Sequence, residues 1–245
     1  MAVILKNGAV FLHIPKTGGT WVTGVLRESG LMRCSIGHRH ANLPHVLAPG
    51  NQGLGRSLEY FYKRARFLKT HPRPFTFCFV RHPLDWYESF YLYKSQPKLN
   101  WERDGEIDNI HRWHPNAILN GLGSNELGEG RDFNDFMTAV MDKFPGYVSA
   151  LYSHYTFRPM DFIGRQENLS EDLITVLERT GCVFDAGAIR GRERINRSRD
   201  ASVKPEWAPT VRARALRLEA AAMERFGYER EGSDILTYPL NTVDS

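Results

Sequence analysis

The sequence is poor in cysteine and has no long apolar run. Its three cysteines, Cys34, Cys78 and Cys182, show no C-x-x-C spacing, which argues against a disulfide framework or a zinc ribbon and favours a reducing compartment. No window holds about 18 consecutive apolar residues, and residues 1–16 show neither the basic leader nor the cleavage site of a signal peptide. We therefore expect a cytoplasmic protein without a membrane span.

Neither positive nor negative charge predominates strongly in the sequence. The chain of 245 residues has 32 Lys and Arg against 28 Asp and Glu, a net charge of +4. The excess is concentrated in residues 63–73 and 190–199, and the remaining residues are net acidic. This distribution is not that of a uniformly basic nucleic-acid coat, so we expect no nucleic-acid partner. With 42% hydrophobic residues, the chain can bury the core of one domain, residues 1–245.

Strand and helix patterns alternate along the chain. Residues 9–14 are an apolar run typical of a strand covered on both faces, and a helical period begins at Thr20 and stops at Gly30. A second run, 75–80, leads into a helix that starts at Pro83. The alternation predicts an α/β fold of three layers, with a P-loop-like central parallel sheet flanked by helices.

Weaker patterns complete this organisation. A third strand near 161–164 precedes a helix that Ser170 would cap. Helical periods also occur at 54–67, 133–143 and 205–226, whereas the glycine-rich stretch 95–131 has no clear period. A stretch of that length is either a functional loop or disordered.

The turn after the first strand predicts an anion site. Two adjacent glycines let successive N–H groups approach a ligand, and the helix that follows adds the positive end of its dipole. Lys16 supplies a full charge beside them. The hydroxyls of Thr17 and Thr20 add donors, and the glycines are Gly18 and Gly19. We interpret the segment 13–20 as a phosphate-binding loop rather than a turn that needs glycine for geometry alone.

This loop is not a Walker A motif. In that motif the lysine follows the glycines, beside a hydroxyl that binds magnesium, whereas Lys16 precedes them. The second strand ends in Arg81 where a magnesium-dependent enzyme places an aspartate. An arginine repels a metal and attracts a second phosphate. The two features together predict a nucleotide with two separated phosphates, bound without metal.

The segments FLHIPKTGGT and FVRHPLDWYESF resemble the 5′-phosphosulfate loop and the 3′-phosphate segment of sulfotransferases that use 3′-phosphoadenosine 5′-phosphosulfate (PAPS). The likeness is closest to the carbohydrate-type branch, including the heparan sulfate 6-O-sulfotransferases with their HI-x-KTGGT string. The segments 161–169, 195–198 and 224–228 are similar to later family motifs. The resemblance implies the sulfotransferase fold, with PAPS as co-substrate and a hydroxylated small molecule or glycan as acceptor.

The resemblance also implies which residues bind the nucleotide. The 5′-phosphosulfate would contact the loop residues Lys16, Thr17, Gly18, Gly19, Thr20 and Trp21. The 3′-phosphate would contact Arg81 and Ser89, and the basic stretch 190–199 would close over it through Asn196, Arg197 and Ser198. A solvated serine at position 89 and a solvated basic face at 190–199 remain alternatives.

His13 and Lys16 are the predicted catalytic residues. In sulfuryl transfer, negative charge grows on the bridging oxygen of the leaving nucleotide, and the ammonium of Lys16 would stabilise it. His13 shares a strand face with Ala9 and Phe11 at the strand's carboxyl end, where α/β sheets bind ligands. This position, which matches the base of the 6-O branch, makes His13 the predicted general base; a buried core histidine is the alternative.

Acceptor contacts and rival functions complete the hypotheses. His40, Trp101 and Trp113 are candidate acceptor-side residues, although the tryptophans equally suit loop anchors. The histidines at 38–45 lack the spacing and partners of a zinc site, so we expect no metal. The rival readings are a metal-dependent kinase or NTPase-like phosphotransferase and a non-catalytic binder of polyanions.

Overall fold

The structure, a computed structural model, describes residues 2–36, 67, 69–94, 132–193 and 205–228. Its strands are β1 (Ala2–Leu5), β2 (Val10–Leu12), β3 (Met32–Ile36), β4 (Thr76–Val80) and β5 (Phe162–Arg165). Its helices are α1 (Gly19–Glu28), α4 (Pro83–Lys94), α7 (Phe133–Lys143), α8 (Tyr147–Thr156), α9 (Leu169–Arg179), α10 (Ala186–Arg190), α11 (Pro209–Leu218) and α12 (Ala220–Arg225), with a 3₁₀ helix η1 (Gln166–Asn168). The predicted helix 54–67 lies almost wholly outside these residues.

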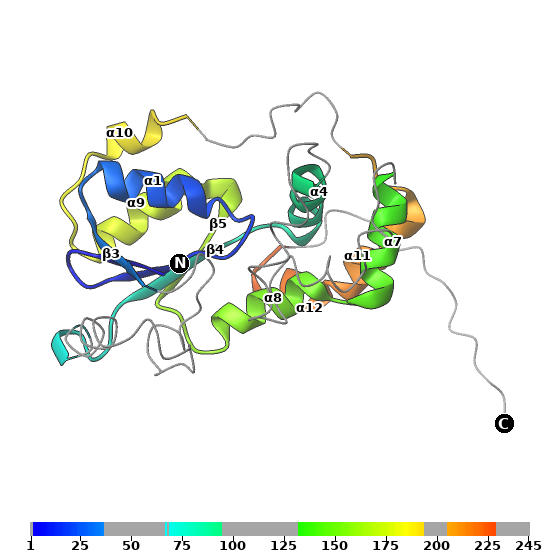
Figure 1. The fold of residues 1–245 in the computed structure, drawn as a ribbon, viewed down its shortest axis with the longest axis horizontal. Coiled ribbons are helices and arrows are strands. Elements are labelled where there is room, and N and C mark those ends of the chain that lie inside the picture. Colours follow the sequence, from blue (N-terminus) through cyan, green and yellow to red (C-terminus); the bar gives the residue numbers. More distant parts are fainter. Residues whose placement is uncertain (1, 37–66, 68, 95–131, 194–204, 229–245) are drawn as a thin grey trace, which may run out of the picture.

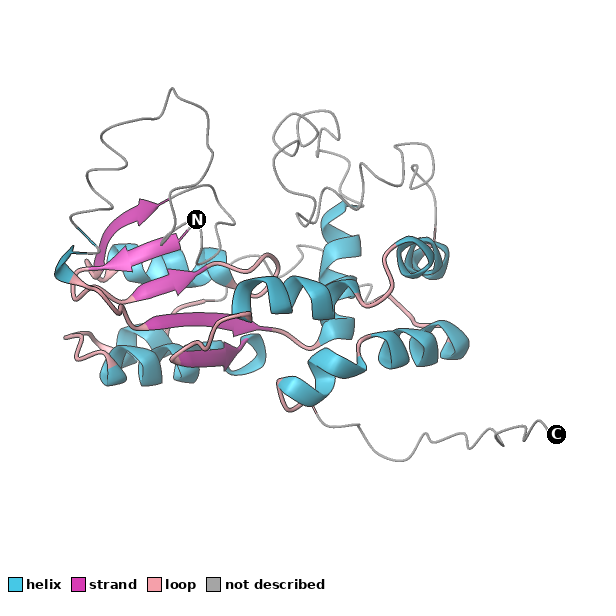
Figure 2. Cartoon of the chain, turned by 90° about the horizontal axis from the view of Figure 1, so that it is seen from below, coloured by secondary structure: helices cyan, strands magenta, loops and turns pink. Residues whose placement is uncertain are grey.

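The strands form one mixed sheet in the order β3-β1-β2-β4-β5. Strands β2, β4 and β5 are parallel, whereas β1 runs antiparallel to β2 and β3. The predicted α/β fold with a central parallel sheet is therefore confirmed in β2, β4 and β5, and on one side β1 adds an antiparallel strand that was not predicted. Figure 2 shows the strands side by side as one layer.

The antiparallel side comes from a hairpin that the sequence analysis missed. β1 and β2 are joined by a tight turn in which Gly8 has φ 90° and donates its N–H to the carbonyl of Leu5 at 3.0 Å. A turn this short can only reverse the chain, so β1 and β2 must run antiparallel. An Asn-Gly pair is the usual signal for such a turn, and Asn7-Gly8 supplies it here.

The two faces of the sheet carry separate apolar cores. Ala9 and Phe11 lie in the core formed with α1, α9 and α10, and Val10, Leu12 and Ile14 lie in the core formed with α4, α7, α8, α11 and α12. The predicted alternation of residues 9–14 between faces is thus confirmed, as are the three layers. The second group of helices extends past the end of the sheet to which β4 leads (Figure 1).

Several predicted helix boundaries are confirmed. Gly30, with φ 64°, follows the end of α1, and Pro83 is the first residue of α4. Two details differ. Ser170 lies inside α9, whose N-cap is Asn168. The helical stretch 205–226 is two helices, α11 and α12, separated at Glu219.

The break at Glu219 is stabilised by a buried carboxylate. Glu219 is 0% exposed and accepts hydrogen bonds from the Tyr87 hydroxyl at 2.5 Å, from the N–H of Val148 at 3.1 Å, and from the N–H and hydroxyl of Ser149 at 2.7 Å each. Val148 and Ser149 are in the first turn of α8, whose N–H groups have no partner within the helix. Glu219 therefore joins α4, α8, α11 and α12.

We predict that Glu219→Ala lowers the free energy of unfolding by about 3 kcal/mol, because it leaves several buried donors without an acceptor. Urea denaturation measures this change as a lower midpoint at unchanged slope. The matched control is Glu224→Ala, an exposed glutamate on α12, which should change stability by no more than about 0.5 kcal/mol. Equal effects of the two substitutions would contradict a capping role for Glu219.

Candidate active site

The two predicted phosphate-binding segments emerge at the same edge of the sheet. Leu12 of β2 pairs with Cys78 of β4, and the two strands are parallel neighbours. Lys16 lies four residues beyond Leu12 and Arg81 three residues beyond Cys78, so both follow the carboxyl ends of adjacent strands. From β2 the chain crosses through α1 toward β3, whereas from β4 it proceeds to β5 on the other side. This is a topological switch point, where open α/β sheets bind ligands.

The loop between β2 and α1 has the backbone of an anion-binding turn. Lys16 has φ 65° and Gly18 has φ 83°, both in the left-handed region. That region is uncommon for a residue with a side chain, so the conformation of Lys16 is held by its surroundings. Left-handed residues next to a helix N-terminus turn successive N–H groups toward one point, where an anion can accept them. Gly19 is the first residue of α1.

Contacts from other elements fix this loop. The indole N–H of Trp86, in α4, donates to the Pro15 carbonyl at 2.9 Å, and the Thr17 hydroxyl donates to the Ile14 carbonyl at 2.9 Å. Trp86 is fully buried and Thr17 is 1% exposed. The hydroxyl of Thr17 therefore stabilises the turn, and its N–H is the group left for the predicted phosphosulfate contact.

The ammonium of Lys16 lies over the ring of Tyr93, with Nζ 4.3 Å from the ring centroid. Tyr93 belongs to the last turn of α4, the helix that follows Arg81. A cation over an aromatic face is attracted by the ring quadrupole without being neutralised. This contact places the ammonium of Lys16 beside α4, at the same edge of the sheet as Arg81. The sequence analysis gave Tyr93 no role.

His13 lies against the start of α1. Its ring stacks with Phe11 at 6.1 Å between centroids, and it is 5% exposed. A Cβ atom added to Gly19 would lie 2.0 Å from Cδ2 of His13, which shows how closely the ring contacts the backbone of the loop. The predicted strand face of His13 is confirmed by this packing. The ring is a neighbour of the phosphate loop rather than an exposed side chain.

Arg81 has a fixed backbone and an unpaired guanidinium nitrogen. Its N–H donates to the Tyr152 hydroxyl at 3.0 Å, and that hydroxyl donates to the Arg81 carbonyl at 2.7 Å. Its Nε is buried and has no hydrogen-bond partner. A buried donor without a partner is costly, so an acceptor from a ligand would stabilise this arrangement. Ser89 is half-buried on α4, and its contact with the same ligand stays a prediction.

Thr20 and Trp21, which are also predicted to contact the 5′-phosphosulfate, differ in burial. Thr20 is exposed in the first turn of α1. Trp21 is 2% exposed, packs in the core beneath α1 and donates its indole N–H to the carbonyl of Glu193 at 3.1 Å. The indole of Trp21 therefore serves the fold, and only its backbone N–H is left for a ligand.

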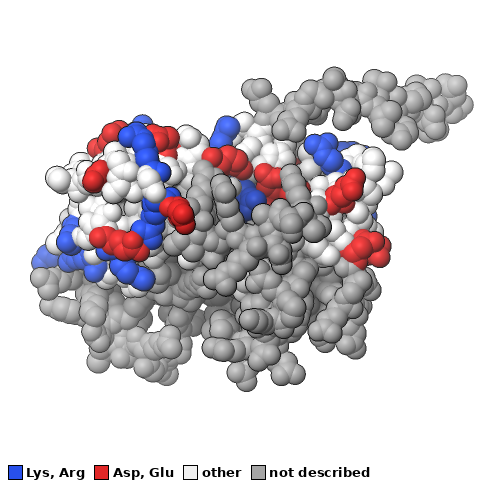
Figure 3. All heavy atoms as spheres, turned by 90° about the horizontal axis from the view of Figure 1, so that it is seen from above, with Lys and Arg blue, Asp and Glu red and all other residues white. Residues whose placement is uncertain are grey.

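The described part of the basic stretch is ion-paired. Arg190 contacts Glu171 through two hydrogen bonds of 2.8 Å, and Arg192 contacts both carboxylate oxygens of Glu28. The hydrogen bond from Arg192 lowers the pKa of Glu28, and that from Arg190 lowers the pKa of Glu171. On the face in Figure 3, cationic and acidic side chains are intermixed. Both arginines described in this stretch are therefore ion-paired with glutamates, and the closure of the stretch over the nucleotide stays a prediction.

Other predicted site residues lie outside the described ranges. They are the nucleotide contacts Asn196, Arg197 and Ser198 and the acceptor-side residues His40, Trp101 and Trp113. Two structural findings concern the described residues alone. None of their helices is long and apolar enough to cross a membrane, and no three of their His, Cys, Asp or Glu side chains cluster as metal ligands.

Sequence reasoning missed four residues that shape the site. Tyr93 and Trp86 lie within the segment that resembles the 3′-phosphate motif, and Glu167 lies within GR-x-EN-L, but no role followed from those strings. Tyr152 belongs to α8, a helix that was not predicted. Their roles come from contacts between residues about 70 to 85 positions apart, which no local pattern shows.

The comparisons agree with this geometry. Residues 2–222 match the sequence model described as the sulfotransferase family, so the chain belongs to that family. The protein is therefore an enzyme, a sulfotransferase, and the family implies PAPS as co-substrate and a small acceptor. No curated protein and no solved structure gives a significant match.

We predict that Gly19→Ala lowers the rate of sulfuryl transfer by about 10²-fold, the effect of an ångström-scale misplacement of a reacting group. The helical backbone at Gly19 accepts alanine, but the new Cβ would displace the ring of His13 or the loop itself. Steady-state kinetics measures the change. Gly191→Ala is the control. The nearest atom to its new Cβ would be the carbonyl oxygen of Gly187 at 3.4 Å, and its φ of −74° suits alanine. Unchanged kinetics for Gly19→Ala would show that the loop tolerates displacement.

Proposed function

We propose that the protein transfers the sulfuryl group of PAPS to a hydroxyl group of a carbohydrate or another small hydroxylated metabolite, in line and without a metal. The observation that carries the proposal is the pairing of β2 with β4, because it brings the turn containing Lys16 and the residue Arg81 to one edge of the sheet. Two cationic sites at one switch point suit a nucleotide with an anionic group at each end.

The residues present fit such a nucleotide. The left-handed turn at Lys16 and Gly18, followed by α1, offers N–H groups to the 5′-phosphosulfate. The buried Nε of Arg81 lacks an acceptor, which a 3′-phosphate would supply. Among the described residues, no acidic cluster stands beside these cations to hold a metal. The site therefore matches an anion held by cations and amides.

Lys16 would stabilise the leaving group. PAPS supplies the sulfuryl group and a leaving nucleotide whose bridging oxygen gains charge as the bond to sulfur breaks. In the structure the ammonium of Lys16 lies over the Tyr93 ring, with Nζ 4.3 Å from the ring centroid. An ammonium already positioned beside the loop needs little reorganisation to meet this charge, which is the condition for strong electrostatic catalysis.

His13 would accept the proton of the acceptor hydroxyl. An imidazole can act as a general base, and the ring of His13 contacts the first residue of α1, next to the predicted phosphosulfate site. The close packing on Phe11 and Gly19 limits the ring to one region. That restriction suits a base that must meet the acceptor in a fixed geometry.

The proposal is tested by assaying transfer from PAPS in the presence of EDTA, with Lys16→Ala as the variant. We expect full turnover of the wild type without metal and a fall of about 10²–10³-fold for Lys16→Ala, the size of effect seen when an oxyanion donor is removed. A requirement for magnesium would instead favour the kinase reading. Wild-type activity in Lys16→Ala would remove this residue from the mechanism.

His13 is tested by separating binding from chemistry. For His13→Gln, which keeps a polar side chain but has no titratable ring, we expect loss of transfer with nearly unchanged affinity for 3′-phosphoadenosine 5′-phosphate (PAP) by calorimetry. His13→Ala should behave in the same way. If both variants lose affinity for PAP together with activity, His13 supports the loop and is not the base.

A further inference from the structure

The backbone on both sides of the Arg81–His82 peptide is held by side chains from distant elements. We propose that Tyr152 and Glu167 are positioning residues that aim Arg81 at the 3′-phosphate and so set the preference of the enzyme for a 3′-phosphorylated nucleotide. This inference rests on the proposed function, since it assumes that Arg81 binds that phosphate. It assigns no chemical step to either residue.

Tyr152 takes the place of a strand partner for Arg81. β4 pairs with β5 as far as Val80, so the N–H and carbonyl of Arg81 lie just past the ladder. The Tyr152 hydroxyl accepts from this N–H at 3.0 Å and donates to this carbonyl at 2.7 Å. Burial raises the pKa of Tyr152 well above its ordinary value, so the hydroxyl keeps the proton that it donates. One side chain thus satisfies both backbone groups of the arginine.

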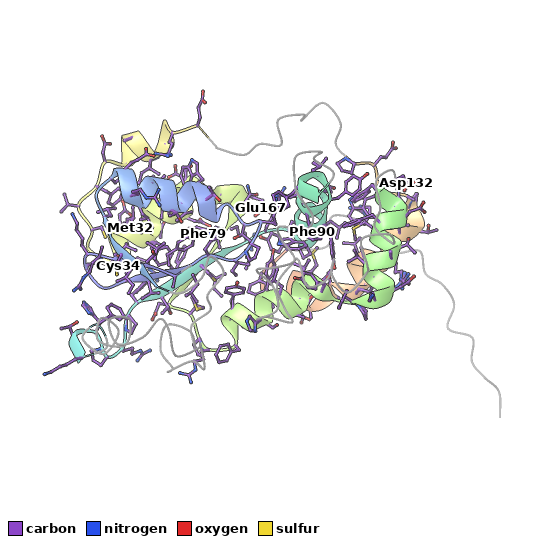
Figure 4. All side chains as sticks on the ribbon, in the orientation of Figure 1. Met32, Cys34, Phe79, Phe90, Asp132 and Glu167 are labelled. Carbon is purple, nitrogen blue, oxygen red and sulfur yellow. The ribbon has the colours of Figure 1, made fainter. Side chains whose placement is uncertain are left out.

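Glu167 fixes the next residue. It lies in η1, directly after β5, at the end of the sheet that faces α4 (Figure 4). Its Oε1 accepts the N–H of His82 at 2.8 Å, and its Oε2 accepts the hydroxyl of Tyr228 at 3.1 Å. The rings of His82 and Tyr228 meet edge to face, with 5.3 Å between centroids. The segment after β4 is thereby tied to β5 and to the residues that follow α12.

Contacts with Arg165 hold Tyr228 in place. The guanidinium of Arg165 lies 5.0 Å from the centre of the Tyr228 ring, and its Nη2 donates to the carbonyls of Phe226 and Gly227 at 2.9 Å each. Burial, with the nearby Glu167 carboxylate, raises the pKa of Tyr228 well above its ordinary value. The Tyr228 hydroxyl therefore stays protonated as a donor to Glu167.

These contacts matter because, among the described residues, no acceptor holds the Nε of Arg81. The direction of a side chain that lacks such a partner depends on the backbone from which it starts. Two residues of backbone, Arg81 and His82, form three hydrogen bonds with the side chains of Tyr152 and Glu167. Loss of these bonds would let the arginine move without disturbing the loop at Lys16, which is held separately by Trp86.

The test compares affinities for PAP and for adenosine 5′-phosphate, which lacks the 3′-phosphate, by calorimetry on the full chain. We expect Tyr152→Phe and Glu167→Ala each to weaken PAP binding by about tenfold, because each removes hydrogen bonds that orient a charged group. The affinity for adenosine 5′-phosphate should stay within about twofold of the wild-type value. Glu167→Gln should keep the wild-type preference, because an amide can still accept from His82 and donate to Tyr228.

Glu171→Ala is the matched control, since it removes a glutamate of α9 that pairs with Arg190, and it should change neither affinity. Equal loss of both ligands in Glu167→Ala, or an unchanged preference in both variants, would overturn the inference. Glu167 is exposed, so its variants test the proposal even if Tyr152→Phe fails to fold. A wild type that binds both nucleotides equally would overturn the proposed function as well, which distinguishes the two failures.

Discussion

The site depends on the parallel pairing of β2 with β4. This pairing fixes two chain segments about 70 residues apart at one edge of the sheet, and each segment then leads into a helix. The helix after β4 returns to the other segment, because Trp86 binds the Pro15 carbonyl and Tyr93 receives the ammonium of Lys16. A sequence that did not pair these strands would hold the same residues without forming a site.

The cations near the sheet differ in what they contact. Arg190 and Arg192 form ion pairs with Glu171 and Glu28, and both pairs are on the side of the sheet covered by α1, α9 and α10. Lys16 lies over the ring of Tyr93, and the buried Nε of Arg81 has no acceptor among the described residues. The modest net charge of the chain therefore hides a site whose field favours an anion.

The sequence predicted those parts of the fold that depend only on residues near one another in the chain. The alternation of residues 9–14 between two cores follows from strand geometry, and the boundaries at Gly30 and Pro83 follow from backbone conformations that these residues favour. The side chain of Trp21 could not be placed in this way, because its partner is the carbonyl of Glu193, 172 residues away. The helix α8 was not predicted, although its buried residues recur at helical spacing; three of the six are tyrosines, which carry a polar hydroxyl.

The sheet alone does not determine the span of the site. Neighbouring strands lie only about 4.8 Å apart, whereas a ribose separates the two anionic groups of the proposed nucleotide, so the side chains that bind them must diverge. Contacts with different helices hold the two side chains. The ammonium of Lys16 lies over Tyr93 in the last turn of α4, whereas the backbone of Arg81 is held by Tyr152 of α8. The helices beyond the sheet, and not the strands alone, thus decide where each cation is held.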